Sequence, residues 1–472
     1  MPSETVQYDL VVIGGGPGGY TAAIRAAQAG LRCALVEQEE HLGGVCLHWG
    51  CIPTKGLLRA AEIYRLVRGA GQFGVRTGEV AVDWDQVVGR SRSLPPGLAR
   101  GVAGLMKRHG IAVRRGRGRL TPGRQVEVLG ADGQVAATLT SPRVLLATGG
   151  APRSLPGVAV DGERIWSSRH ALAAPACPRS LAVVGAGPVG VELACFFATF
   201  GSQVTLIEAA PQVLPHEDEE LAALLGRALE SQGIAVRTGL EVVAAAGRGP
   251  EAIRLQVRDR AGGAATEVEA ERALVAVGVV GNTAGLGLEA LGVRTRHGAV
   301  EVDERFQTSA PGIWAVGDLV GPPQLAHAAA AEAAAAVEAM VGDGGRAPAR
   351  PAIPRCVYSH PQVASVGLTE AAARERGEEV KVGRFPFAAS GLARAAGEAE
   401  GLVKLVFGAR YGELLGAGIV GPQATELIAE LGLALTLEAT WEELAATVHA
   451  HPTLSEAVME AAGAAFGHSV NI

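Results

Sequence analysis

The chain has 472 residues, which corresponds to about three domains at roughly 150 residues each. Hydrophobic residues make up 48% of it and charged residues 19%, a composition that can bury a core and excludes general disorder. The formal net charge of -6 and the aromatic content of 4% exclude a basic, base-stacking surface for nucleic acid.

Neither a signal peptide nor a membrane-spanning helix is indicated. Every apolar stretch is broken by glycine or charge before the ~20 residues that a bilayer requires. Six cysteines in a chain of this length do not form the framework of a secreted, disulfide-rich protein. We therefore expect a cytoplasmic location.

A first dinucleotide-binding unit is predicted at the start of the chain. Its predicted elements are a strand at 8–13, a helix at 20–29 and a strand at 33–36. The glycines between the first strand and the helix have the spacing G-x-G-x-x-G, at Gly14, Gly16 and Gly19. This spacing lets the backbone approach a pyrophosphate at a helix N-terminus. Glu37, at the end of the second strand, supplies a carboxylate that can accept hydrogen bonds from ribose hydroxyls.

The next chemical feature is the cysteine pair Cys46 and Cys51. Two cysteines five positions apart near a helix start fit a redox disulfide, because a helix N-terminus stabilises a thiolate. The spacing alone leaves two other interpretations open, half of a zinc site or two buried thiols. A zinc site would need a second close pair of Cys or His residues, and none is evident, so we expect no metal.

A second unit repeats the pattern of the first about 170 residues later. Its predicted elements are a strand at 181–184, a helix at 191–200 and a strand at 204–207. Its glycines are Gly185, Gly187 and Gly190. Glu208 closes the second strand, where a carboxylate repels a 2′-phosphate, and the residues after it supply no cation to hold one. The second unit therefore favours NAD over NADP.

Further strands and one helix surround these two units. The predicted strands are 144–147, 273–277 and 313–316, and an alanine-rich helix is predicted at 326–340. The stretch 342–354 is rich in Gly and Pro and predicts a linker. The last ~120 residues alternate strand-like and helical segments, which favours a separate α+β domain.

Near the C-terminus, His451 stands five residues before Glu456. A carboxylate beside an imidazole raises its basicity and fixes its orientation. On these residues alone, a turn histidine before Pro452 is the commoner interpretation.

The segments Gly43–Cys46 and Cys51–Lys55 resemble the active-site motif of the pyridine nucleotide–disulfide oxidoreductases. Residues His449–Glu456 are similar to the dihydrolipoamide dehydrogenase branch of that family. Further similar segments span essentially the whole chain, at 147–149, 276–278, 312–318, 325–327 and 353–370.

The resemblance implies an α/β fold with two Rossmann-like dinucleotide-binding domains, one for FAD and one for NAD, plus a C-terminal α+β dimerisation domain. The implied domains are FAD-binding at 1–152 and 281–347, NAD-binding at 153–280 and dimerisation at 348–472. The implied partners are a second copy of the chain, with active sites shared between subunits, and the lipoyl domain of an E2 or another lipoyl carrier.

The resemblance also implies site residues. Cys46 and Cys51 would form the redox-active disulfide, and Lys55 would lie near the flavin and pair with Glu192. His451, oriented by Glu456 and followed by a cis proline bond, would be the base in the partner's active site. The implied FAD contacts are Gly14, Gly16, Gly19, Glu37, Gly44, Lys55, Gly118, Thr148, Gly149, Asp318 and Ala326. The implied NAD contacts are Gly185, Gly187, Gly190, Glu208, Val242 and Gly278.

The implied reaction is oxidation of protein-bound dihydrolipoyl groups by NAD⁺, as in the E3 component of 2-oxoacid dehydrogenase complexes or related lipoyl systems. Two departures from the family's usual residues stand out, His48-Trp49 between the cysteines and Val279-Val280 after Gly278. The alternatives are an NAD(P)H-dependent disulfide reductase for another substrate and a non-catalytic flavoprotein docking subunit.

Overall fold

The computed structural model describes residues 4–248, 252–263, 265–342, 344 and 352–472. The chain forms two compact units, each built from three stretches of sequence. Unit 1 consists of Met1–Leu57, Asp83–Arg153 and Gly278–Pro348, and unit 2 consists of Leu58–Val82, Ser154–Val277 and Ala349–Ile472. None of the helices in the described residues is long and apolar enough to cross a membrane.

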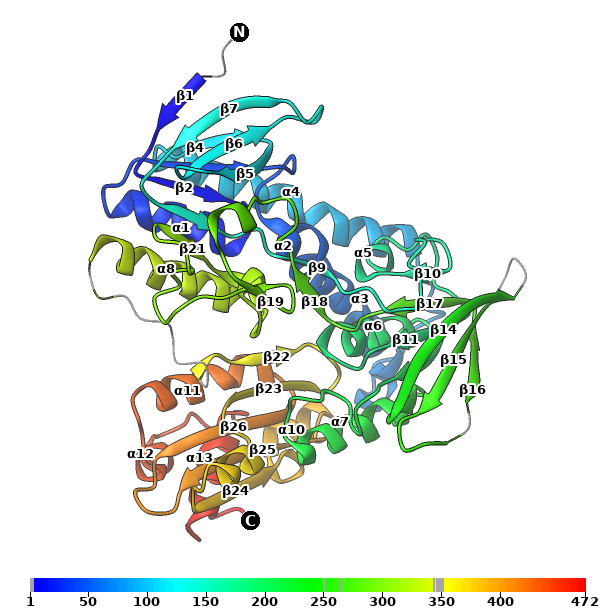
Figure 1. The fold of residues 1–472 in the computed structure, drawn as a ribbon. Coiled ribbons are helices and arrows are strands. Elements are labelled where there is room, and N and C mark those ends of the chain that lie inside the picture. The colour runs from blue at the N-terminus through cyan, green and yellow to red at the C-terminus, as the bar shows by residue number, and fades with distance from the viewer. Residues whose placement is uncertain (1–3, 249–251, 264, 343, 345–351) are drawn as a thin grey trace. The chain divides into compact units, whose positions relative to one another are not determined.

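A five-stranded parallel sheet forms the centre of unit 1 (Figure 1). Its strands, in spatial order, are β21 (Ile313–Ala315), β8 (Val144–Leu146), β2 (Leu10–Ile13), β3 (Cys33–Glu37) and β4 (Ala112–Arg115). Helix α1 (Pro17–Gln28) joins β2 to β3, which pair in parallel from Leu10↔Cys33 to Ile13↔Val36. The predicted strand–turn–helix–strand unit is confirmed, and the helix begins earlier than predicted because Pro17 fits a first helical position.

Successive side chains of a strand point to opposite faces of the sheet, and each face of this sheet packs in a different hydrophobic core. Leu10 and Val12 pack with the buried alanines of α1 and of α8 (Ala326–Val341). Val11 and Ile13 pack against a second, four-stranded sheet. Its strands, in order, are β1 (Glu4–Gln7), β7 (Val135–Thr140), β6 (Gln125–Leu129) and β5 (Arg117–Thr121).

Three further helices and two small sheets complete unit 1. The helices are α2 (Gly44–Trp49), the first turns of α3 (Cys51–Gly69), and α4 (Trp84–Arg108). The antiparallel pairs are β9 (Gly150–Pro152) with β18 (Val279–Gly281) and β19 (Thr295–Arg296) with β20 (Ala299–Val300).

Unit 2 contains a second module of the same design. Its parallel sheet has the order β10 (Ile165–Trp166), β17 (Arg272–Val275), β11 (Ser180–Val184), β12 (Gln203–Ile207) and β13 (Ala235–Arg237). The associated helices are α5 (Ser168–Ala171), α6 (Pro188–Thr199) and α7 (Glu219–Ser231). One face of this sheet packs against the antiparallel strands β14 (Leu240–Arg248), β15 (Ala252–Asp259) and β16 (Thr266–Ala270). The second predicted dinucleotide module is thereby confirmed.

The C-terminal part of unit 2 is an antiparallel sheet with helices. The sheet order is β22 (Arg355–Val357), β23 (Gln362–Gly367), β26 (Leu414–Gly421), β25 (Leu402–Gly408) and β24 (Val380–Pro386). The helices are α9 (Glu370–Glu375), α10 (Gly391–Ala396), α11 (Ala424–Thr436), α12 (Trp441–Ala446) and α13 (Glu456–Ala465). Buried residues of α11 and α13 share one core with the sheet, so the predicted α+β domain is confirmed. Most of the predicted linker 342–354 lies outside the described residues.

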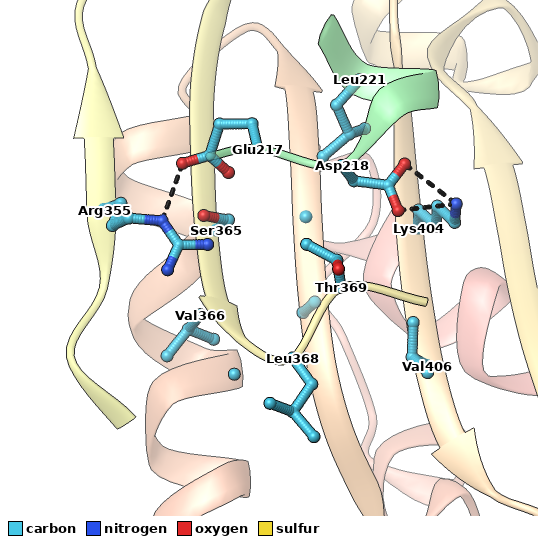
Figure 2. Close-up of a pocket in the computed structure, with 13 residues that line it drawn as sticks. Glu217, Asp218, Leu221, Arg355, Ser365, Val366, Leu368, Thr369, Lys404 and Val406 are labelled. Atoms are coloured by element: carbon cyan, nitrogen blue, oxygen red, sulfur yellow. Dashed lines mark hydrogen bonds and ion pairs between the residues drawn. The ribbon is translucent and has the colours of Figure 1, made fainter. Parts of the chain in front are cut away.

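A buried ion cluster ties α7 to the C-terminal sheet within unit 2. The ammonium of Lys404, a residue that is 5% exposed, lies 2.9 Å from both carboxylate oxygens of Asp218. It also lies 3.1 Å from a carboxylate oxygen of Glu220 and of Glu370. Burial opposes the charge on Lys404, but hydrogen bonds to these carboxylates outweigh it and raise its pKa. Figure 2 shows Asp218 and Lys404 lining a small pocket, which contains none of the predicted site residues.

Replacing Lys404 with Met should destabilise unit 2, because Asp218 loses the cation that compensates for its burial, whereas Glu220 and Glu370 keep their ion pairs with Arg384. We expect a loss of about 3 kcal/mol, measured as a lower midpoint of thermal unfolding at pH 7. Since the folded-state pKa of Lys404 is raised, this stabilisation is present at neutral pH and is lost as the pH rises through that pKa. Lys107→Met, on an exposed residue of α4, is the control and should leave the midpoint nearly unchanged. Equal midpoints for the two variants would contradict the prediction.

Candidate active site

The glycine turn of each module is held by the carboxylate at the end of the module's second strand. The Gly15 N–H donates to Glu37 Oε2 at 2.6 Å, and the Ala186 N–H donates to Glu208 Oε2 at 2.7 Å. Helices α1 and α6 begin directly after these turns, with no side-chain cap on their first N–H groups. Uncapped N–H groups at the positive end of a helix dipole fit a pyrophosphate, so both turns fit a dinucleotide.

A close contact explains the third glycine of each turn. A Cβ atom on Gly19 would stand 1.8 Å from the carbonyl oxygen of Gly14. A Cβ atom on Gly190 would stand 1.9 Å from the carbonyl oxygen of Gly185. Because no side chain fits at either position, each helix starts in direct contact with its own turn.

The loop that carries the cysteines docks on the first glycine turn. The Gly43 N–H donates to the carbonyl of Gly15 at 2.8 Å, and a Cβ on Gly44 would lie 2.8 Å from the Cα of Gly16. Gly43 and Gly44 have φ values of +121° and +61°, which favour glycine. Helix α2 therefore starts against the turn, and Cys46 is placed by the same backbone that would hold the cofactor.

Cys46 on α2 and Cys51 at the start of α3 form a disulfide, with their Cα atoms 4.7 Å apart. This bond excludes the half zinc site and the pair of free buried thiols in this state. Helix α3 is 19 residues long, and the positive end of its dipole lies at Cys51, where it favours a thiolate after reduction. Burial raises the pKa of Cys33 to about 12 and that of Cys195 to about 11, so these free thiols stay protonated.

The segments after β8 and β21 are fixed by polar contacts. The Thr148 hydroxyl donates to the carbonyl of Asn282, and the Asn282 side-chain amide donates to the carbonyl of Thr148, each at 2.9 Å. The backbone N–H of Asn282 donates to the carbonyl of Gly149 at 2.9 Å. Asp318 follows β21, and burial raises the pKa of its carboxyl.

Glu332 is a site-supporting residue that sequence reasoning missed. Its carboxylate is buried and accepts a hydrogen bond from the Gly317 N–H at 2.7 Å, which fixes the backbone just before Asp318. The available signal was that Glu332 lies between two runs of four alanines in this helix, on an apolar stretch where a buried carboxylate needs a partner.

Four further residues were predicted to contact a cofactor: Gly118, Gly278, Ala326 and Val242. Gly118, on β5, passes so close to β2 that a Cβ would stand 2.7 Å from the Ile13 side chain. Gly278 follows β17 with φ of +95°, and Ala326 is the first residue of α8. The Val242 side chain is buried in the core of the second module, so only its backbone can reach a ligand.

Lys55 and Glu192 belong to different units, and their predicted pairing stays a prediction. Lys55 lies on α3, one turn after Cys51. Glu192 is buried on α6, where its Oε1 accepts a hydrogen bond from the Tyr358 N–H at 2.9 Å.

His451 and Glu456 form the hydrogen-bonded pair that the sequence predicts. His451 Nδ1 lies 2.8 Å from Glu456 Oε1, and the Thr453 N–H donates to Glu456 Oε2 at 2.8 Å. The Thr453 N–H first, and then His451, lower the pKa of Glu456, so this carboxylate is ionised at neutral pH. The contact through Nδ1 leaves Nε2 as the ring nitrogen for proton transfer. The His451–Pro452 bond is cis, as expected.

His449, two residues earlier, has the opposite environment. Its side chain is 5% exposed, and its ring nitrogens lie 2.8 Å from Glu430 Oε1 and 2.9 Å from the carbonyl of Thr447. The side chain of His451 is 81% exposed. His449 therefore holds the loop to α11, while His451 is presented at the surface.

A disulfide docked on one of two dinucleotide turns defines a dinucleotide-dependent disulfide oxidoreductase. Residues 8–333 match the family model described as pyridine nucleotide-disulphide oxidoreductase, and residues 353–462 match that family's dimerisation domain. The chain belongs to the pyridine nucleotide-disulphide oxidoreductase family.

Within this family, the chain is similar over nearly its whole length to curated dihydrolipoyl dehydrogenases and to a solved structure. The dihydrolipoyl dehydrogenase of Chlorobaculum tepidum is 49% identical over 458 residues, which cover 97% of this chain and 96% of the relative. The dihydrolipoyl dehydrogenase of Bacillus subtilis is 42% identical over 478 residues, covering 98% and 99% of the two chains. The crystal structure of LpdA from Mycobacterium tuberculosis matches with a TM-score of 0.89 at 29% identity, covering 96% and 99%.

Gly19 and Gly190, the third glycine of each turn, allow a matched test of which cofactor each turn binds. Gly19→Ala should lower the amount of FAD that copurifies, because the added methyl pushes α1 away from its turn. Gly190→Ala should retain FAD but weaken NADH binding about tenfold or more, a loss of at least about 1.4 kcal/mol. Flavin absorbance and NADH titration measure the two effects. Loss of FAD in both variants, or in neither, would contradict the assignment.

Proposed function

We propose that the chain is a dihydrolipoyl dehydrogenase, which oxidises protein-bound dihydrolipoyl groups to lipoyl with NAD⁺ as the acceptor. The observation that carries the proposal is the His451–Glu456 pair in a chain whose Cys46–Cys51 disulfide docks on a dinucleotide turn. Relatives that bear this enzyme name align over nearly the whole chain, which supports the same reaction.

The chemistry of the chain's own residues is thiol–disulfide exchange. His451 of the partner subunit takes a proton from one dihydrolipoyl thiol, and the resulting thiolate attacks Cys46 Sγ. The Cys46–Cys51 bond breaks, a mixed disulfide forms at Cys46, and Cys51 leaves as a thiolate. The second substrate thiol, after losing its proton, attacks the substrate sulfur of the mixed disulfide, which releases lipoyl and the Cys46 thiolate. Two electrons and two protons have then left the substrate.

The residues present fit the two cofactors that the family uses. The turn at Gly14–Gly19 would hold FAD and the turn at Gly185–Gly190 would hold NAD⁺. Together the two cofactors would supply the electron-accepting and hydride chemistry that reoxidises the reduced cysteines. We assign FAD binding to residues 1–152 and 281–347, NAD binding to 153–280 and dimerisation to 348–472.

Glu208 supports NAD rather than NADP. Its two carboxylate oxygens accept hydrogen bonds from the Ala186 and Ala210 N–H groups at 2.7 and 2.8 Å. A carboxylate fixed there accepts ribose hydroxyls and repels a 2′-phosphate.

A homodimer with shared active sites is part of the proposal. The C-terminal domain leaves Leu433, Leu437 and Val448 at 60%, 69% and 94% exposure, in the same domain as the exposed His451. Large exposed apolar side chains mark an interaction surface, and residues 353–462 match the family's dimerisation domain. A second copy would cover this surface and exclude water from the base.

The proposed partner is a lipoyl domain of an E2 or another lipoyl carrier, and the proposed location is the cytoplasm. Among the described residues, Cys33, Cys177, Cys195 and Cys356 form no disulfide, as is usual for proteins of a reducing compartment.

The test is anaerobic reduction of the purified protein by dihydrolipoamide, followed by NAD⁺ or NADP⁺. We expect the flavin spectrum to change on reduction and NAD⁺, not NADP⁺, to restore it with formation of NADH. Reduction by NADH but not by dihydrolipoamide would favour a disulfide reductase for another substrate. Reduction by neither would favour a non-catalytic flavoprotein.

Substitution of the base should separate the two halves of the reaction. His451→Gln should lower the rate of dihydrolipoamide oxidation by about 10²–10⁴-fold, because the thiol loses its general base. Glu456→Gln should lower it by about 10–100-fold, because the imidazole loses a charged hydrogen-bond partner. The control is NADH oxidation by ferricyanide, which does not need the base and should be unchanged. A parallel loss of both activities would contradict the assigned role.

A further inference from the structure

An arginine–tryptophan stack lies beside the cysteine pair within unit 1. Trp49 is the last residue of α2 and lies between Cys46 and Cys51 in sequence. The guanidinium carbon of Arg92, on α4, lies 3.8 Å from the centroid of the Trp49 ring. The same guanidinium donates a hydrogen bond from Nη1 to the backbone carbonyl of His48. Arg92 and Trp49 are both partly buried, so these contacts are shielded from bulk water.

The arginine is carried on a backbone that is fixed against the start of α3. The hydroxyl of Ser91, the residue before Arg92, is buried and donates to the carbonyl of Pro53 at 2.7 Å. A Cβ on Gly56 would stand 3.2 Å from the Cα of Ser91, so α3 and α4 touch closely at this point. Arg92 therefore has a set position relative to the helix that begins at Cys51.

His48, next to Trp49 at the same end of α2, contacts the segment that precedes the helix. His48 Nε2 lies 2.9 Å from the carbonyl of Leu42, and the His48 ring stacks on His41 with centroids 6.1 Å apart. Both residues of the unusual His48-Trp49 pair are thus engaged in contacts that hold α2 in place.

Arg92 places its positive charge at the end of α2, which precedes Cys51 in the sequence. The last carbonyls of a helix carry partial negative charge, and α2 ends at Trp49, two residues before Cys51. Uncompensated, that end would oppose a thiolate at Cys51. The guanidinium at the His48 carbonyl places a permanent positive charge there instead. In unit 1, α2 also carries His48, the first turns of α3 carry Lys55, and His41 stacks on His48.

The geometry points to Arg92 as a positioning residue for the redox pair. Its guanidinium, held by the Trp49 ring and the His48 carbonyl, fixes the end of α2 and favours the thiolate form of the reduced cysteines. The inference rests on the proposed function only in requiring a redox-active Cys46–Cys51 pair, whichever disulfide substrate the enzyme serves.

Three variants separate charge from contact. Arg92→Gln removes the charge but keeps a side-chain donor for the His48 carbonyl. Arg92→Lys keeps the charge but loses the planar stack. Trp49→Leu removes the aromatic face that holds the guanidinium. The readout is the rate at which iodoacetamide alkylates Cys46 and Cys51 across a pH series, in phosphine-reduced holoenzyme without oxygen, with peptide mass spectrometry separating the two.

We expect Arg92→Gln to slow alkylation of Cys51 at pH 7 about three- to tenfold and to move the pH profile to higher pH. Arg92→Lys should restore most of the rate, and Trp49→Leu should give a smaller loss in the same direction. Arg100→Gln, on an exposed arginine of the same helix, is the matched control and should show the wild-type profile.

An unchanged profile in Arg92→Gln, or equal losses in Arg92→Gln and Arg92→Lys, would overturn the inference. An unchanged profile in Trp49→Leu would show that the ring does not hold the charge and would overturn that part. The proposed function fails separately, if wild-type cysteines alkylate readily but dihydrolipoamide does not reduce the enzyme. If Arg92→Gln shows the wild-type pH profile of alkylation and full dihydrolipoamide turnover, the role of Arg92 is contradicted and the proposed function still stands.

Discussion

The carboxylate at the end of the second strand is the constraint on which the first module depends. Glu37 accepts the Gly15 N–H at 2.6 Å through one oxygen and the Glu39 N–H at 2.8 Å through the other. The turn fixed in this way presents the Gly15 carbonyl to Gly43, and with it the loop that leads to Cys46. One carboxylate thus fixes both the glycine turn that would bind the pyrophosphate and the start of α2, the helix that carries Cys46. Glu208 makes the corresponding contacts in the second module, to the Ala186 and Ala210 N–H groups.

Parallel strands bring the rest of each site to one edge. In unit 1, the carboxyl ends of β2, β8 and β21 lead into Gly14, Thr148 and Asp318. In unit 2, β11 and β17 end side by side at Val184 and Val275, and β11 leads into Gly185. Neighbouring parallel strands end at the same edge, so residues more than a hundred positions apart come together with no further device. The sheet therefore does most of the positioning, and the polar contacts of Glu332 and Asn282 fix the loops that it delivers.

The sequence predicted those features that repeat a local rule, and it missed those that depend on long-range contacts. The two glycine turns and the cysteine pair follow from spacing, and the structure contains each of them. Lys404 pairs with Asp218, 186 positions away, and Arg92 donates to the carbonyl of His48, 44 positions away. The positions of lysines and arginines in the sequence do not predict such contacts. The helices that follow the two glycine turns start three residues earlier than predicted, because their first residues, which begin with Pro17 and Pro188, do not show the alanine-rich or apolar pattern. The helix predicted from residue 326 starts at Ala326.

The histidines at 449 and 451 show why local sequence could not assign the base. Both precede Glu456, but one ring is buried between Glu430 and Thr447 while the other is exposed. An exposed imidazole is hydrated, and a second surface that excludes water would strengthen its interaction with a substrate thiol. Leu433 and Val448 also favour a covering surface, because burying apolar side chains that are this exposed lowers the free energy. In the proposed dimer one contact meets both needs, so association and catalysis depend on the same surface.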